Sequence, residues 1–282
     1  MARHAPRHSL PRRTAFAAAL LSFAMVSSAE AGQSLVRSAQ SWSYQLTGNM
    51  GNIIASNADV VVVDAESGGP AARFKTKPGG GRRAAIAYLS VGEAEKWRGY
   101  WKGCCASGSP SWLTSTTQGW AGNYAVKFWE PGWKAIVQAR VRDVFAKGYD
   151  GLYLDRIDTW ERFGTKAQMI QFIREIAAQA RSIKGDAAIM VQNGEELLDN
   201  AGYVSTIDAI AKEDLFHGVK HDGRRNPQPM ISGSLQLLNR AKAQGKKIFV
   251  VEYLKGDTAA GVAAEIRKQG YVPNFAGRNL NY

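Results

Sequence analysis

Carboxylate side chains directly follow apolar runs at two places in this sequence. The stretch GLYLDRID, residues 151–158, leads into Asp155 and Asp158, and the stretch AIAKED ends in Glu213 and Asp214. Two carboxyl groups in different surroundings can share the cleavage of a bond, because one can hold a proton while the other stays ionised. These acids are therefore the first candidates for a catalytic site.

Polar side chains also follow the other apolar runs. They are Asp64, Tyr88 with Glu93, Asn193 with Glu195, Glu252 with Tyr253, and Asn274. The opposite ends of the runs are rich in basic residues and glycine: Arg82, Arg83, Lys147, Gly148, Lys184, Gly185, Lys246 and Lys247. Any strand end can be polar because it meets a loop, but an acidic bias repeated at one end predicts a shared acidic site.

The elements that would position these residues alternate between strands and helices. Eight short apolar runs, the first of them weak, lie at residues 41–46, 55–64, 82–90, 151–155, 187–193, 206–213, 246–253 and 271–276. The runs are continuous rather than alternating, which indicates strands buried on both faces, as in parallel sheets. Helical periodicity covers residues 131–148, 166–183 and, more briefly, 258–269.

This order predicts an α/β fold, a single-domain (β/α)8 TIM-type barrel over residues 32–282. In such a barrel the carboxyl ends of the strands converge on one mouth, where barrel enzymes keep their chemistry. An open doubly wound sheet is the alternative. A glycine-rich phosphate loop after an early strand would favour it, but residues 67–70 and 78–83 lack both the required spacing and the helix that should follow. We expect Gly79 to Gly81 to form a turn.

The first 31 residues resemble a secretory signal peptide. Four arginines precede the apolar run TAFAAALLSFAMV, and Ala29-Glu30-Ala31 matches an A-x-A cleavage site. A membrane anchor is the alternative, but this run is shorter than the ~20 apolar residues that span a bilayer, so we expect no stable membrane insertion. We predict a secreted or periplasmic protein cleaved near Ala31, and the pair Arg12-Arg13 leaves twin-arginine export open.

Charge and cysteine content limit the partners. The 282-residue chain carries a net charge of +12, and residues 32–282 keep +9 from 32 basic and 23 acidic side chains. Such a charge can indicate a nucleic-acid partner, but the basic residues are scattered, so we expect no nucleic acid. We also expect no cofactor and a monomer. Adjacent Cys104 and Cys105 do not easily reach ordinary disulfide geometry; a strained vicinal ring is the alternative to a simple loop feature, and we assign the pair no chemistry.

An acidic mouth with aromatic rings nearby suits glycoside hydrolysis. The rings that crowd one region of the sequence are Trp97, Tyr100, Trp101, Trp112, Trp120, Tyr124, Trp129 and Trp133. Core packing is the usual place of aromatic residues, and we expect it for Trp133, while some of the others line a groove. A metal site is the other use of clustered carboxylates, but the histidines are poorly placed and Asp155-x-x-Asp158 lacks the rest of a calcium loop, so we expect no metal.

Six stretches resemble the endo-α-1,4-polygalactosaminidase family of glycoside hydrolases. They are YQL (44–46), AYLSVGEAEKWRGYW (87–101), FWEPGW (128–133), GYDGLYLDRID (148–158), QNGEEL (192–197) and KEDLF (212–216). They occur in order and cover nearly the whole chain after residue 31. The resemblance implies a secreted barrel enzyme that acts on a polysaccharide containing α-linked galactosamine or its N-acetyl form.

The resemblance also implies two catalytic carboxylates, with Asp155 as nucleophile and Glu213 as general acid and then base, in a retaining mechanism. Asp155 should then stay ionised, while burial or the like charge of Asp155 and Asp214 should raise the pKa of Glu213. Ion pairs of Asp155 with Arg156 and of Glu213 with Lys212 are the alternative. Adjacent strand residues point to opposite faces, which disfavours both pairs.

Further residues are candidates for substrate binding. They are Asp64, Tyr88, Glu93, Trp129, Asp158, Asn193, Glu252 and Tyr253. His217 and His221 are expected at the groove rim. Two other functions fit the sequence, namely a barrel that binds glycan without hydrolysing it and a scaffold whose basic surface holds an anionic polymer. The acetylation of the polymer and its role, such as biofilm remodelling or nutrition, leave no mark on the sequence.

Overall fold

The computed structural model describes Met1 and residues 31–105, 109–117 and 121–281. Its strands are β1 (Trp42–Gln45), β2 (Val60–Asp64), β3 (Ala84–Ser90), β4 (Glu93–Glu95), β5 (Leu113–Thr116), β6 (Asn123–Val126), β7 (Gly151–Asp155), β8 (Ala188–Gln192), β9 (Ala209–Glu213), β10 (Lys247–Glu252) and β11 (Val272–Phe275). Its α-helices are α1 (Ala31–Ser38), α2 (Gly51–Ala55), α3 (Ala65–Gly68), α4 (Gly99–Cys104), α5 (Pro131–Ala146), α6 (Lys166–Ile183), α7 (Ala201–Thr206), α8 (Gln228–Ala243) and α9 (Gly256–Lys268). Short 3₁₀ segments cover Ala71–Phe74, Ile157–Glu161 and Glu195–Asp199.

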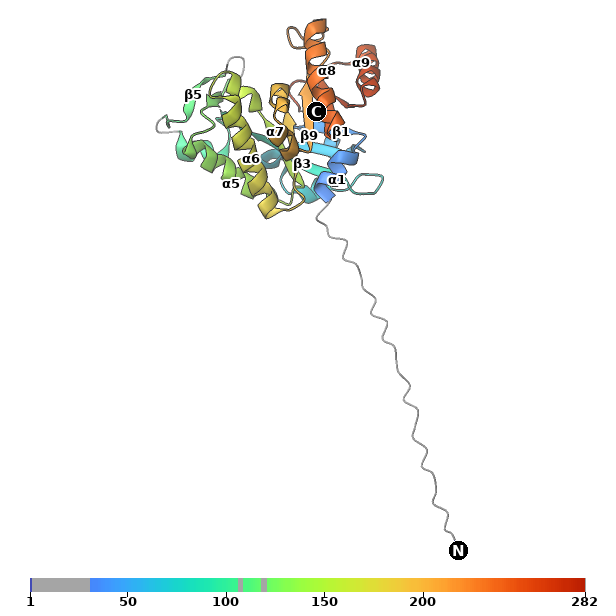
Figure 1. Ribbon diagram of the computed structural model, residues 1–282, viewed down its shortest axis with the longest axis horizontal. Coiled ribbons are helices and arrows are strands. Elements are labelled where there is room, and N and C mark those ends of the chain that lie inside the picture. Colours follow the sequence, from blue (N-terminus) through green and yellow to red (C-terminus); the bar gives the residue numbers. More distant parts are fainter. Residues whose placement is uncertain (2–30, 106–108, 118–120, 282) are drawn as a thin grey trace.

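Eight parallel strands form a nearly closed barrel, in the order β1-β2-β3-β7-β8-β9-β10-β11. Each corresponds to one of the eight predicted runs, so the barrel prediction is confirmed. The gap between β1 and β11 is bridged by Trp42, whose Nε1 donates to the Val272 carbonyl at 3.1 Å. Helices α5 and α6 lie together on one side of the strands, and α8 and α9 lie on another (Figure 1).

Alternate residues of the strands serve two separate cores. In β2, Val60 and Val62 face the barrel interior, while Val61 and Val63 face the helices, and all four are fully buried. This two-sided burial explains why the run has no polar alternation. Aromatic rings fill the interior toward the mouth, with the Tyr44 and Tyr153 centroids 5.1 Å apart.

The predicted helices and turn are also present. Helix α5 begins at Pro131, whose fixed φ and missing N–H suit a first helical turn, and α6 begins after Thr165, whose hydroxyl accepts from the Gln168 amide at 3.2 Å. Residues 77–81 form the expected glycine turn, with the Gly80 amide donating to the Lys77 carbonyl at 2.9 Å. Within the described residues, no helix combines the length and apolar character needed to cross a bilayer.

An insertion between β3 and α5 was not predicted. It comprises β4, α4, β5 and β6, and its three strands form a separate antiparallel sheet in the order β4-β6-β5. Figure 1 shows β5 at the periphery, away from the barrel strands. Cys104 and Cys105 lie at the end of α4 and are joined in a disulfide, so the vicinal ring, rather than a loop feature without a bond, is what the structure contains.

The end of the barrel opposite the mouth is not simply basic. Asp150 and Asp208 precede β7 and β9 and are fully buried. Asp208 accepts from Arg37 of α1 at 2.7 Å and from Arg181 of α6 at 3.0 Å. Of the basic residues at these strand ends, Arg82 binds Asp150 at 2.7 Å, so buried aspartates account for part of the basic character of this end.

Candidate active site

The carboxyl ends of the barrel strands surround a cavity of about 450 Å³. Its lining includes both predicted catalytic acids and five predicted substrate-binding residues: Asp155, Glu213, Asp64, Tyr88, Glu93, Asn193 and Tyr253. It also includes residues that were not predicted, among them Tyr44, Glu95, Trp97, Arg98, Asn123, Arg156, Gln192, Arg278, Asn279 and Leu280. Of these, Gln192 adjoins Asn193 at a strand end, and Trp97 belongs to the aromatic cluster from which some groove-lining rings were expected.

Asp155 ends β7 and is held by two donors. The Tyr88 hydroxyl donates to Oδ2 at 2.7 Å, and the Arg156 backbone amide donates to Oδ1 at 2.7 Å. Burial raises the pKa of Asp155 to about 7; the like charge of Glu213 adds to this, while Arg156 and the Tyr88 hydrogen bond act against it. Burial also raises the pKa of Tyr88 well above its usual value, so its hydroxyl keeps the proton that it donates.

Glu213 ends β9 and is held by neutral donors. Gln192 Nε2 donates to Oε2 at 3.0 Å, Asn193 Nδ2 approaches the same oxygen at 3.5 Å, and the Tyr253 hydroxyl donates to Oε1. The Tyr44 hydroxyl donates to Gln192 Oε1 at 3.2 Å, which turns the amide nitrogen of Gln192 toward Glu213. Glu213 is thus oriented by side chains at the ends of the two neighbouring strands, β8 and β10.

The other acids of the cavity are paired with arginine. Asp64 and Glu95 bind Arg98, which is 4% exposed, and Glu93 binds Arg156 at 2.8 Å. By contrast, neither Asp155 nor Glu213 forms a salt bridge to any described residue. The alternatives raised by the sequence are therefore absent here, because Arg156 pairs with Glu93 and Lys212 pairs with Glu195 at 3.2 Å.

Backbone conformation marks the same strand ends. The residues that directly follow β7, β8 and β9 are Arg156, Asn193 and Asp214, with φ values of 61°, 55° and 51°. Left-handed backbone costs energy for residues other than glycine and is concentrated at functional sites. Each turn carries the chain away from the barrel just after a residue that lines the cavity: Asp155, Gln192 and Glu213.

Three predicted substrate-binding residues do not line the cavity. Glu252 is fully buried and accepts the backbone amides of Phe216 at 2.7 Å and His217 at 3.3 Å, so it supports the loop after β9. Asp158 lies at the start of a 3₁₀ turn, 3.9 Å from Arg156. Trp129 packs edge-on against Phe128, with centroids 5.1 Å apart. Asp158 and Trp129 come after the ends of β7 and β6. Glu252 is on β10, on the face opposite to Val251, which packs inside the barrel. None of the three therefore reaches the cavity.

The aromatic cluster and the histidines divide in the same way. Trp133 is fully buried and donates to the Val91 carbonyl at 2.7 Å, as expected for a core residue. Trp97 is 60% exposed and lines the cavity. Trp120 lies outside the described residues. His217 is a buried member of the loop after β9 and, like His221, does not contribute to the lining.

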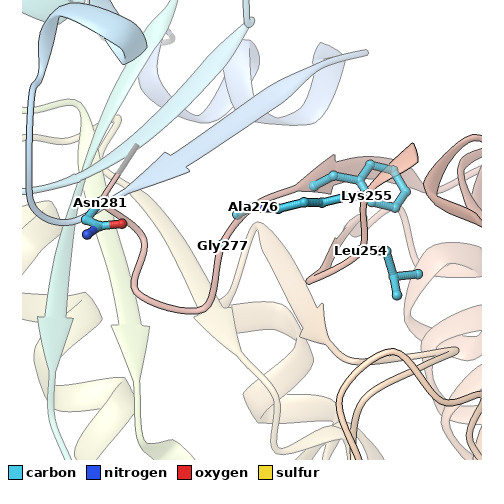
Figure 2. Close-up of a pocket in the computed structure, with 6 residues that line it drawn as sticks. Leu254, Lys255, Ala276, Gly277 and Asn281 are labelled. Carbon is cyan, nitrogen blue, oxygen red and sulfur yellow. The ribbon is translucent and has the colours of Figure 1, made fainter.

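A second hollow of about 320 Å³ lies beside the first. It is lined by Leu254, Lys255, Phe275, Ala276, Gly277 and Asn281 (Figure 2). The chain segment 276–281 separates the two hollows, because its other residues line the main cavity. The described residues include no group of three or more His, Cys, Asp or Glu side chains that could hold a metal ion.

A parallel eight-stranded barrel with an acidic cavity at the carboxyl ends of its strands is the architecture of barrel glycosidases. The chain belongs to glycoside-hydrolase family GH114, whose family model matches residues 25–282. An uncharacterized protein of Deinococcus radiodurans is 33% identical over 254 residues, which cover 86% of this chain and 82% of that protein.

Two solved structures share the fold. The glycoside hydrolase domain of PelA from Pseudomonas aeruginosa has a TM-score of 0.69 at 22% identity, covering 86% of this chain and 97% of that one. Aspergillus fumigatus Ega3, solved in complex with galactosamine, has a TM-score of 0.65 at 18% identity, covering 86% and 92%. At these identities the likeness concerns the fold.

Proposed function

We propose that the protein is an endo-acting glycoside hydrolase that cleaves a polysaccharide of α-1,4-linked galactosamine or N-acetylgalactosamine. The observation that carries the proposal is that Asp155 and Glu213 are the cavity acids without an arginine partner in the described part of the chain. An acid neutralised by arginine is poorly suited to attack or to protonate, whereas these two remain available. The galactosamine bound by Ega3, a structure of the same fold, supports the choice of sugar.

The proposed reaction retains the anomeric configuration. Asp155 attacks the anomeric carbon while the glycosidic C–O bond breaks and the departing oxygen takes a proton from Glu213. A water molecule then attacks the glycosyl-enzyme ester, Glu213 removes a proton from that water, and the Asp155 carboxylate is released. The Tyr88 hydroxyl and the Arg156 amide stabilise the ionised form of Asp155.

The pKa of Asp155 modifies the expected division of labour. The sequence predicted the raised pKa at Glu213, but burial raises that of Asp155 to about 7. At neutral pH only about half of the ligand-free enzyme then has the ionised nucleophile. The rate of the first step should accordingly depend on the deprotonation of Asp155.

Exposed Trp97 and the N-terminal segment complete the proposal. The ring of Trp97 offers an apolar face at the cavity rim, which suits the face of a sugar.

Residues 1–31 act as a signal peptide, so the working enzyme is secreted or periplasmic. N-terminal sequencing of exported protein tests this and should begin near Gly32.

The activity test measures reducing ends released by purified residues 32–282 from partially deacetylated α-1,4-galactosaminan. Wild type should release soluble oligosaccharides, while Asp155→Asn and Glu213→Gln should each lose nearly all turnover. Asp257→Asn, an exposed carboxylate on α9, is the matched control and should retain full activity. More than a tenth of wild-type rate in either cavity variant would contradict the proposed pair.

Azide tests the division of roles. With Asp155→Ala, azide should replace the missing nucleophile and produce a glycosyl azide of inverted configuration. With Glu213→Ala and an activated leaving group, azide should instead produce one of retained configuration. If the two variants gave the opposite configurations, Glu213 would be the nucleophile and Asp155 the acid and base.

A barrel that binds glycan without cleaving it is the second candidate. It predicts retention of the polymer by wild type with no release of reducing ends. A basic scaffold for an anionic polymer predicts instead binding that collapses with added salt and is unaffected by Asp155→Asn.

A further inference from the structure

Arg278 lies in the segment after β11 and binds groups from the loop after β9. Its guanidinium contacts Asp214 Oδ2 at 2.9 Å and Oδ1 at 3.3 Å, Asp222 Oδ1 at 2.5 Å, and the Gly218 carbonyl at 3.3 Å. Asp214 directly follows Glu213 and has a left-handed backbone, with a φ of 51°. The side chain of Arg278 therefore joins the loop after β9 to the segment after β11.

The same guanidinium lies on the ring of Tyr253. Arg278 Cζ is 4.5 Å from the Tyr253 centroid, within the range of a cation–π contact. Tyr253 in turn donates its hydroxyl to Glu213 Oε1. Burial and the neighbouring charge of Glu213 raise the pKa of Tyr253, so the hydroxyl stays protonated as a donor. A continuous chain of contacts thus runs from Arg278 through Tyr253 to Glu213.

The segment that carries Arg278 has little support behind it. Figure 2 shows Ala276 and Gly277 beside the second hollow, and a Cβ added to Gly277 would meet no atom within 4 Å. Farther along, the Leu280 carbonyl accepts the amides of Leu46 at 2.8 Å and Thr47 at 3.1 Å, which ties the segment to the end of β1. The bonds of Arg278 are thus the main anchor between these ties and the Ala276 amide, which donates to the Glu252 carbonyl at 3.2 Å.

We propose that Arg278 is a positioning residue for the reaction, holding Tyr253 so that its hydroxyl orients Glu213 toward the departing oxygen. This inference rests on the proposed role of Glu213. Arg278 need not touch the sugar, so its removal should affect kcat more than KM. The planar guanidinium of Arg278 both stacks on the Tyr253 ring and binds two carboxylates. Both kinds of contact together are difficult for the ammonium group of a lysine to make.

The kinetic test compares Arg278→Ala, Tyr253→Phe and the double variant. Each single change should lower kcat about 10- to 100-fold with KM changed less than about threefold, since small displacements of a reacting group cost this much. If Arg278 acts through Tyr253, the double variant should fall within about threefold of Tyr253→Phe. Multiplying losses, or a change in KM alone, would overturn the inference.

Arg225→Ala is the matched control. Arg225 also lies in the loop after β9, binds one carboxylate, Glu265, with two nitrogens at 2.9 and 2.6 Å, and lies 5.5 Å from the Phe216 ring. It does not line the cavity, so its loss should leave kcat near wild type. Arg278→Lys should recover less than a tenth of the lost rate.

A structural measurement separates this inference from the choice of substrate. A crystal structure of Arg278→Ala should show the Tyr253 hydroxyl displaced from Glu213. A crystal structure of Arg225→Ala should show the Tyr253 hydroxyl still in contact with Glu213. An unchanged Tyr253–Glu213 contact in Arg278→Ala would overturn the inference even if galactosaminan proves the wrong polymer. An inactive wild type would count against the proposed function alone.

Discussion

Ionisation of Asp155 sets the expected pH dependence. The proposed nucleophile must be charged, and its pKa is raised to about 7, so kcat/KM should rise as pH increases through about 7. Tyr88→Phe removes a hydrogen bond that lowers this pKa. The acidic limb of the profile should therefore move to higher pH in this variant. A limb unchanged in Tyr88→Phe, or moved to lower pH, would contradict this account of Asp155.

The same pKa makes Asp155 costly to the fold. Its folded-state pKa lies above the usual 3.8, so the stabilisation from holding the proton is complete below about pH 4 and is lost as pH rises through about 7. Asp155→Asn removes the buried charge. Its Tm should exceed that of wild type by several degrees at pH 8, at about 2–4 °C per kcal/mol for a chain of this size, and by much less at pH 4. Equal differences at both pH values would rule out this linkage.

Single residues were predictable where the strand pattern alone determines their place. Asp155 and Glu213 end apolar runs, so the sequence could place them at one mouth. The arginine partners that neutralise Asp64 and Glu93 could not be foreseen, because Arg98 comes from the insertion and Arg156 turns away from its own strand. Without those partners, all the acids of the mouth looked alike.

At the scale of elements, Arg98 holds the insertion against the barrel. It follows β4 and precedes α4, and its guanidinium binds Glu95 of β4 and Asp64 of β2. Arg98→Met should leave buried Asp64 without a cation and Glu95 with Arg140 alone, at 4.0 Å, and destabilise the protein by about 3 kcal/mol. Urea denaturation monitored by tryptophan fluorescence measures the loss.

Arg98→Lys is the control for charge. It keeps one positive charge but not the two-pronged geometry, so its loss of stability should lie between wild type and Arg98→Met. A loss below 1 kcal/mol for Arg98→Met would show that the insertion is held mainly by apolar packing.

The barrel strands were predictable and the insertion was not, for a physical reason. Strands such as β2 are buried on both sides, so their sequences are continuous apolar runs. Strand β5 is only partly buried at Leu113 and Thr114 and exposed at Ser115 and Thr116. Its sequence, LTST, has neither a continuous run nor a clear alternation. A strand in a small peripheral sheet buries few side chains, so its sequence has little hydrophobic pattern from which it could be predicted.

For the whole molecule, the two ends of the barrel separate activity from stability. Asp208 lies at the end opposite the mouth and joins Arg37 of α1, Arg181 of α6 and the Ile189 amide of β8, the last at 2.9 Å. Asp208→Ala should destabilise the protein by about 1–3 kcal/mol, because the buried Ile189 amide loses its acceptor, while Arg37 and Arg181 keep access to solvent. At 25 °C the fraction that remains folded should keep the wild-type kcat.

Thermal unfolding measures the stability of Asp208→Ala, and active-site titration gives its kcat per folded molecule. Asp257→Asn, which changes an exposed carboxylate, should alter neither. A fall in kcat per folded molecule in Asp208→Ala would mean that the two ends of the barrel are coupled.

The overall architecture was predictable from the number of strands and their order. The particular contacts that close the barrel were not, since they run through the side chain of Trp42 and through the segment after β11. Neither feature has a periodic signal. The cavity wall that contains Arg278 and Leu280 was missed for the same reason.

The closing contact of Trp42 with Val272 has a consequence for the order of folding. The two residues are 230 positions apart in the chain, and the bond from Gly32 to Asp186 spans 154. Bringing such distant segments together costs loop entropy before any contact repays it, so closure of the seam should be a late step. Until then, the edges of β1 and β11 lie open to solvent. A chain in that state offers exposed strand edges to its neighbours, and its yield on refolding should fall steeply as protein concentration rises.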